Sequence, residues 1–151
     1  MDHSRPSDSI SDFFQQDHRE IDPLLFGLDF RDPLKTLPRF EDFDRRLERH
    51  IRWEEELLFP AAGAANRALE QGPLIVMRED HVRIRAAKAD ALAALRRGDG
   101  TGAKTHSDRM VAILCGHNLK EERILYPACD QLLSSRERQV ILEEVRSSKS
   151  G

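Results

Sequence analysis

Residues 50–60 read HIRWEEELLFP, and residues 117–127 read HNLKEERILYP. Both stretches have the form H-x-x-x-E-E-x-[LI]-L-[FY]-P, so that His50 corresponds to His117. A shorter pair precedes them, since residues 17–21 read DHREI and residues 80–84 read DHVRI. Self-similarity of this kind indicates a structural repeat. We therefore interpret each half of the chain as one hairpin of helices, and expect a pseudo-twofold axis to bring the two halves together at one symmetric site.

Apolar residues recur at helical spacing around these motifs, from Ser9 almost to the end of the chain, and no stretch alternates as a strand does. We expect helices at 9–28 (kinked at Pro23), from Asp32–Pro33 to Phe59–Pro60, and from Gly72–Pro73 to the GDGTG turn at 98–102. A further helix is expected from that turn to the LYP at 125–127, and a short one from Ser134. Ile124 and Val140 are among the residues expected to face inward. Long amphipathic helices with short links predict an all-α, antiparallel up-down four-helix bundle with an additional short C-terminal helix.

Composition limits the class of protein. The chain has 151 residues, of which 39% are hydrophobic and 34% charged, which suits a single folded domain over residues 9–151 behind a flexible N-terminal tail at 1–8. A net charge of −3 argues against a nucleic-acid partner. No apolar run reaches the roughly 20 residues of a membrane span, and no signal core is present, so we expect a cytoplasmic protein without a membrane partner. Two cysteines in that setting are expected to be reduced thiols.

Six polar side chains fall on the apolar stripes: His18, His50, Glu54, His81, His117 and Glu121. Each His of the longer motif stands four residues before its Glu, so the two side chains lie on one face, about 6 Å apart along the helix. Burying two carboxylates costs several kcal/mol each unless something compensates. Two divalent ions would compensate better than protonated histidines, and imidazole with carboxylate suits iron, manganese or zinc. We expect each Glu to bridge two metals and two His to bind each metal.

Other readings stay open. A single His on an apolar face is usually a core residue with a satisfied hydrogen bond, so a metal-free helical interaction module is the alternative to a metal protein. Glu55 and Glu122 are rotated about 100° from the proposed ligands, and we favour hydrogen-bond acceptors for ligand histidines over direct ligands. Asp17 and Asp80 are candidates for the same role. Tyr126 is expected to be a packing residue with a wet hydroxyl.

The order H…H-x-x-x-E-E…H…H-x-x-x-E, followed by LFP and LYP, resembles the hemerythrin-like family with its HHE cation-binding domain, over roughly residues 9–130. The resemblance implies a four-helix bundle with two iron ions in an oxo- or hydroxo-bridged diiron centre, bound by the six residues above. Met77 stands where oxygen carriers have a further His, so the chain looks closer to the four-His, two-Glu branch. The resemblance implies binding or sensing of O2, nitric oxide or iron, or handling of reactive oxygen or nitrogen species. The alternative is a diiron enzyme that decomposes peroxide or reduces nitric oxide.

Overall fold

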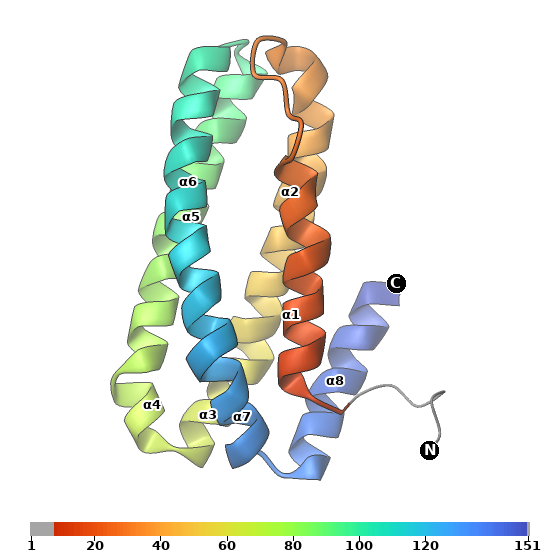
Figure 1. Cartoon of the computed structure of the whole chain (residues 1–151), viewed down its shortest axis with the longest axis vertical. Coiled ribbons are helices and arrows are strands. Elements are labelled where there is room, and N and C mark those ends of the chain that lie inside the picture. Colours follow the sequence, from red (N-terminus) through yellow and green to blue (C-terminus); the bar gives the residue numbers. More distant parts are fainter. Residues whose placement is uncertain (1–7, 151) are drawn as a thin grey trace.

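The structure is a computed structural model that describes residues 8–150, and every regular element within that range is helical (Figure 1). In chain order the elements are α1 (Ile10–Ile21), η1 (Asp22–Leu25), α2 (Pro33–Trp53), η2 (Glu54–Leu58), α3 (Phe59–Ala65), α4 (Arg67–Gln71), α5 (Pro73–Arg96), α6 (Gly100–Lys120), η3 (Glu121–Leu125), α7 (Tyr126–Leu132) and α8 (Ser135–Ser150). Four rods run up, down, up and down: α1, α2, α5 and α6. The predicted fold class is therefore confirmed. The tail predicted at 1–8 lies, except for Asp8, outside the described residues.

Local sequence explains where the helices begin and end. Ser9 caps α1 by accepting a hydrogen bond from the backbone N–H of Asp12 at 3.1 Å. The sequence predicts a kink at Pro23, but α1 instead ends at Ile21, and Pro23 is the second residue of the short 3-10 helix η1. Proline has no N–H to continue the helical ladder, which favours the break over the kink. Gly98 adopts φ 77°, a left-handed conformation that closes α5 at the same end of the bundle as the segment between η1 and α2 (Figure 1).

The helix C-terminal to the bundle docks as predicted. The Ser134 hydroxyl accepts from the backbone N–H of Glu137 at 3.1 Å, and the Glu137 carboxylate accepts from that of Ser134 at 3.0 Å. Ile141 and Val145 of α8 are buried against the lower end of α1, but Val140 is 56% exposed, so its predicted inward position is wrong. The apolar stripe of α8 is narrow because only one side of the helix meets the bundle.

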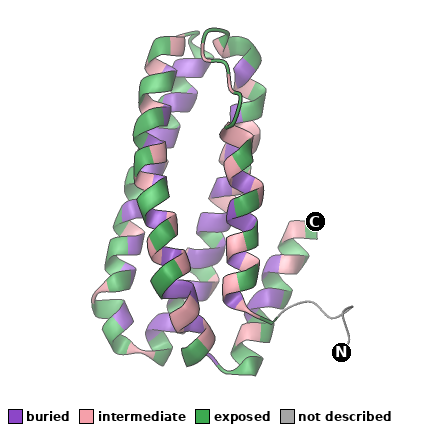
Figure 2. Ribbon diagram, viewed as in Figure 1, coloured by how far each residue is buried: buried purple, intermediate pink, exposed green. Residues whose placement is uncertain are grey.

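The buried residues line the inside of the four rods (Figure 2) and form two apolar clusters. On α1, Phe14 belongs to one cluster and Ile21 to the other. On α5, Met77 and Ile84 are divided in the same way. The buried histidine of each helix lies between these pairs, so a polar layer separates two apolar ones. None of the helices between residues 8 and 150 combines the length and apolar character that a membrane span requires.

Candidate metal centre

The polar layer contains all six side chains that the sequence singled out. Their exposed fractions are 4% or less: His18, His50, Glu54, His81, His117 and Glu121. They come from four rods and two wide turns, because each Glu begins η2 or η3 directly after its α-helix. Buried carboxylates and imidazoles need hydrogen-bond or ionic partners, and these six side chains provide such partners for one another.

Glu54 reaches both pairs of histidines. Its Oε1 lies 3.1 Å from His81 Nε2, and its Oε2 lies 3.5 Å from His50 Nε2. The two oxygens of one carboxylate therefore point to two different places. This is the arrangement that a bridging carboxylate requires.

Glu121 repeats the pattern from the other half of the chain. Its Oε1 lies 3.3 Å from His18 Nε2, and its Oε2 lies 3.3 Å from His117 Nε2. The imidazole rings also pair, with 4.6 Å between the centroids of His18 and His50 and 4.8 Å between those of His81 and His117. The centre thus has a His18/His50 end and a His81/His117 end, and both carboxylates face both ends.

A π-helical turn begins at each Glu. η2 (Glu54–Leu58) and η3 (Glu121–Leu125) occupy equivalent positions in the repeat, and single π turns inside helices are frequent at functional sites. A π-helical turn contains about one more residue than an α-helical turn, so it changes which of the following side chains face inward. Ile124 is consequently 59% exposed, although a continuous α-helix predicts that it is buried, whereas Leu125 is buried.

Two histidines are oriented by aspartates that precede the inward histidines of α1 and α5. His50 Nδ1 donates to Asp17 Oδ2 at 2.7 Å, and His117 Nδ1 donates to Asp80 Oδ2 at 3.0 Å. A lysine accompanies each aspartate: Lys149 of α8 donates to Asp17 at 3.2 Å, and Lys120 donates to Asp80 at 2.7 Å. Each donated Nδ1–H leaves Nε2 of that histidine facing the carboxylates with a lone pair available for a metal.

The other two histidines differ from each other. His81 Nδ1 donates to Glu55 Oε2 at 2.8 Å, as the sequence predicted for Glu55. The equivalent Glu122 brings its Oε1 only to within 3.9 Å of His18 Nδ1, and that nitrogen has no hydrogen-bond partner within the described chain. The expected contact of Glu122 is therefore absent as a hydrogen bond.

Tyr126 belongs to the centre, which the sequence did not predict. The ring is fully buried, and the hydroxyl donates to Glu54 Oε2 at 2.6 Å. The hydroxyl oxygen also lies 3.1 Å from Glu121 Oε1, 3.2 Å from His50 Nε2 and 3.3 Å from His18 Nε2. The prediction of a wet hydroxyl is thus wrong. The signal available in the sequence was the spacing of five residues, which places Tyr126 about one turn beyond Glu121.

The charges of the centre compensate one another. Burial opposes the charged form of His50, but the Glu54 carboxylate and the bond to Asp17 outweigh it and raise the pKa of His50 to about 10. Burial is likewise outweighed at His117, where the Glu121 charge and hydrogen bond raise the pKa to about 9. Burial also opposes the charged form of Glu54, but the His50 charge and several hydrogen bonds overcome it and hold the pKa of Glu54 well below its usual value. Protonated His50 and His117 thus offset the charge of the buried carboxylates in the metal-free centre.

The donor set fits metal ions. Ligand atoms of Glu54, His81, His117 and Glu121 lie within 4.8 Å of one another, as do those of His18, His50 and Glu121. Glu121 Oε2 is buried without a hydrogen-bond partner in the described chain, an oxygen that a metal would satisfy. Imidazole nitrogens and carboxylate oxygens are donors typical of iron, zinc or manganese sites.

Comparison with known proteins supports this description. A family profile described as Hemerythrin HHE cation binding domain matches residues 9–129. A search of curated proteins and a search of solved structures gave no significant match.

Proposed function

The chain belongs to the hemerythrin HHE cation-binding family, and on that premise we propose that it is a cytoplasmic non-haem diiron protein of the four-His, two-Glu kind. The family binds metal ions, and the buried His/Glu cluster fits a metal site. The proposed ligands are the six residues of the centre: His18, His50, Glu54, His81, His117 and Glu121.

The observation that carries the proposal is the division of each carboxylate between the two ends. Since Glu54 and Glu121 each present one oxygen to His18/His50 and one to His81/His117, two ions would share both carboxylates and have two histidines each. The two-ion stoichiometry also suits the charge, because two carboxylates and four neutral imidazoles leave two divalent ions only partly neutralised and open to a small anionic or polar ligand.

The surrounding residues prepare the site. Asp17, Asp80 and Glu55 fix the rings of three histidines, so that their Nε2 atoms stay aimed at the centre. The apolar clusters on both sides of the polar layer exclude bulk water. An iron pair in such a place supplies one-electron changes at two adjacent ions, a chemistry suited to O2, nitric oxide or peroxide. We propose binding or sensing of O2, nitric oxide or iron, or handling of reactive oxygen or nitrogen species.

Anaerobic reconstitution with Fe(II) tests the proposal. We expect two irons per chain, a near-ultraviolet charge-transfer absorption after exposure to air, and a distinct spectrum with nitric oxide. Elemental analysis of the protein as purified distinguishes iron from zinc and manganese. A chain that takes up no metal, and whose His50→Ala variant differs from the wild type only in stability, would be a helical interaction module instead.

The second candidate is an enzyme that decomposes peroxide or reduces nitric oxide. Tyr126 favours it, because a buried O–H donor beside both carboxylates is a proton source within the centre. Steady-state consumption of peroxide or nitric oxide by the iron-loaded protein would support this candidate. Uptake that stops after one equivalent would support the binder.

A further inference from the structure

Glu55 and Glu122 are equivalent in the repeat, but their carboxylates have different neighbours at the two ends of the centre. Glu55 accepts from His81 Nδ1 and also from Arg85 Nη1 at 3.0 Å, so its position is fixed by two donors. Arg85 stands four residues after His81, and the residue that stands four after His18 is Asp22. At the His18/His50 end, Glu122 therefore faces a second acid where Glu55 has a guanidinium. Burial, and to a lesser extent the nearby charge of Glu122, raises the pKa of Asp22.

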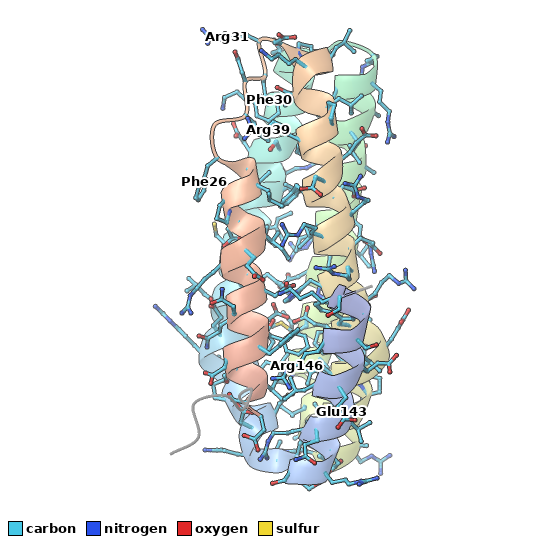
Figure 3. All side chains as sticks on the ribbon, turned by 90° about the vertical axis from the view of Figure 1, so that its right-hand side faces the viewer. Phe26, Phe30, Arg31, Arg39, Glu143 and Arg146 are labelled. Atoms are coloured by element: carbon cyan, nitrogen blue, oxygen red, sulfur yellow. The ribbon has the colours of Figure 1, made fainter. Side chains whose placement is uncertain are left out.

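A surface pocket of about 420 Å³ leads to this acid pair. It lies between η1 and the C-terminal part of α6, and its described lining contains Asp22 and Glu122 but no lysine or arginine. The remaining wall is largely apolar: Leu25, Phe26, Val111, Leu114 and Leu119. Phe26, 67% exposed, projects from the bundle at the rim (Figure 3), and the exposed thiol Cys115 lines the same pocket.

His18 connects this pocket to the centre. Its Nδ1 is on the side of Glu122, buried and without a hydrogen-bond partner among the described residues, while its Nε2 lies 3.3 Å from Glu121 Oε1. The three other histidines of the centre are each tied by Nδ1 to a carboxylate. The ring of His18 is thus the one whose rotation breaks no hydrogen bond at Nδ1.

The two ends also differ in how completely their ligands converge. Four residues bring ligand atoms together at the His81/His117 end, but three do so at the His18/His50 end. There the Tyr126 hydroxyl holds Glu54 Oε2 by a hydrogen bond that an arriving ion has to replace. An ion therefore binds a better preformed site at the His81/His117 end.

Resting on the proposed diiron function, we propose that metal ions enter and leave the centre through the pocket between η1 and α6, and that the ion at the His18/His50 end is the exchangeable one. Asp22 and Glu122 attract the divalent cation, and the His18 ring binds it and rotates to bring it into the centre. The ion at the His81/His117 end binds first and is retained. Such a centre exchanges one of its two ions with the free Fe(II) pool, which suits the sensing of iron.

Release of iron to a ferrous chelator tests the inequivalence. From the loaded full-length chain we expect two phases, each of one iron. His18→Ala should abolish the fast phase and keep one retained iron, whereas His81→Ala should abolish the slow phase. Circular dichroism of each variant checks the fold. Release of both ions at one rate in the wild type would overturn the inference.

The route is tested separately, by the rate of Fe(II) loading. Glu122→Gln should slow the loading of the fast-exchanging ion about tenfold. High salt should reduce this difference between the variant and the wild type. Glu55→Gln, the equivalent change in the repeat, should affect only the retained ion. Equal slowing by both changes would contradict the proposed route.

The pocket can also be blocked by labelling Cys115, without any substitution in the centre. A bulky maleimide on the exposed Cys115 of wild-type protein should slow the fast phase, while the buried Cys129 stays unlabelled. Reagent-treated Cys115→Ser is the control and should behave as untreated protein. An unchanged rate of the fast phase after complete labelling would contradict the proposed route, even if two irons bind normally. Failure of wild-type protein to bind iron at all would instead remove the proposed function.

Discussion

Tyr126 and Phe59 occupy equivalent positions in the repeat, each the fifth residue after its centre glutamate, yet they meet the centre in different ways. Tyr126 donates its hydroxyl to Glu54 at 2.6 Å, whereas Phe59 stacks its ring on His81 with centroids 5.5 Å apart and planes at 13°. One hydroxyl thus makes the two ends of a pseudo-symmetric site chemically unequal.

Exchanging these two side chains tests what the hydroxyl does. Tyr126→Phe removes a hydrogen bond to a buried carboxylate, and we expect the metal-free protein to lose about 1–3 kcal/mol of stability. The loaded protein should lose less, because metal ions then neutralise Glu54. Urea unfolding of both forms measures the difference.

Phe59→Tyr is the matched change and adds a hydroxyl at the His81/His117 end. It should weaken retention of the slow iron. Mössbauer spectra of loaded Tyr126→Phe should show two iron environments that are more alike than in the wild type. Unchanged spectra in both variants would mean that the hydroxyl does not influence the metals.

The bridging role proposed for Glu54 and Glu121 predicts the effect of losing either carboxylate. Glu54→Ala or Glu121→Ala should remove at least one iron per chain, since each carboxylate reaches both ends. Iron content after gel filtration measures this loss. Glu56→Ala, at an exposed position of the same π turn that pairs with Arg52, is the control and should retain two irons. Two tightly held irons in both centre variants would refute the ligand assignment.

The sequence predicted the bundle and the six inward residues because both follow from periodicity. His18 lies between the buried Phe14 and Ile21, and a helix spacing of three and four fixes its direction without tertiary information. The repeat then supplied the symmetry. The pairing of His18 with His50 could not be derived in this way, since it depends on how four rods pack around one axis.

The errors have one main physical source. Ile124 is assigned inward on the assumption of an unbroken α-helix, but the π turn at Glu121 rotates everything beyond it. The same rotation brings Tyr126 into the centre instead of toward solvent. No local propensity indicates a π turn. A π turn nevertheless begins at the Glu of both H-x-x-x-E motifs, and a proline follows each turn. The shared turn explains why the two motifs are alike.

Asp17 and Asp80 should control metal affinity without touching the metal. Asp17→Asn and Asp80→Asn keep the side-chain shape but remove the charge that orients His50 and His117, and we expect metal affinity to fall about 10- to 100-fold. Competition with a chelator of known affinity measures this. Asp90→Asn, which affects only an exposed pair with Arg109, is the control. Equal affinities in all three variants would show that the aspartates serve the fold alone.

The raised pKa values of two histidines predict that the stability of the metal-free protein depends on pH in a way that the stability of the loaded protein does not. The folded pKa of His50, about 10, and that of His117, about 9, exceed the unfolded value of 6.5. Protonation therefore stabilises the metal-free fold fully below pH 6.5, and this contribution is lost as the pH rises through 9 to 10. Metal ions compete with the same protons, so apparent metal affinity should rise over that window. Urea midpoints at pH 6, 8 and 9.5 should fall for metal-free protein but not for loaded protein. A metal-free protein that becomes more stable as the pH rises from 6.5 to 9.5 would mean that these histidines are neutral in the fold, and that the carboxylates are held by other groups.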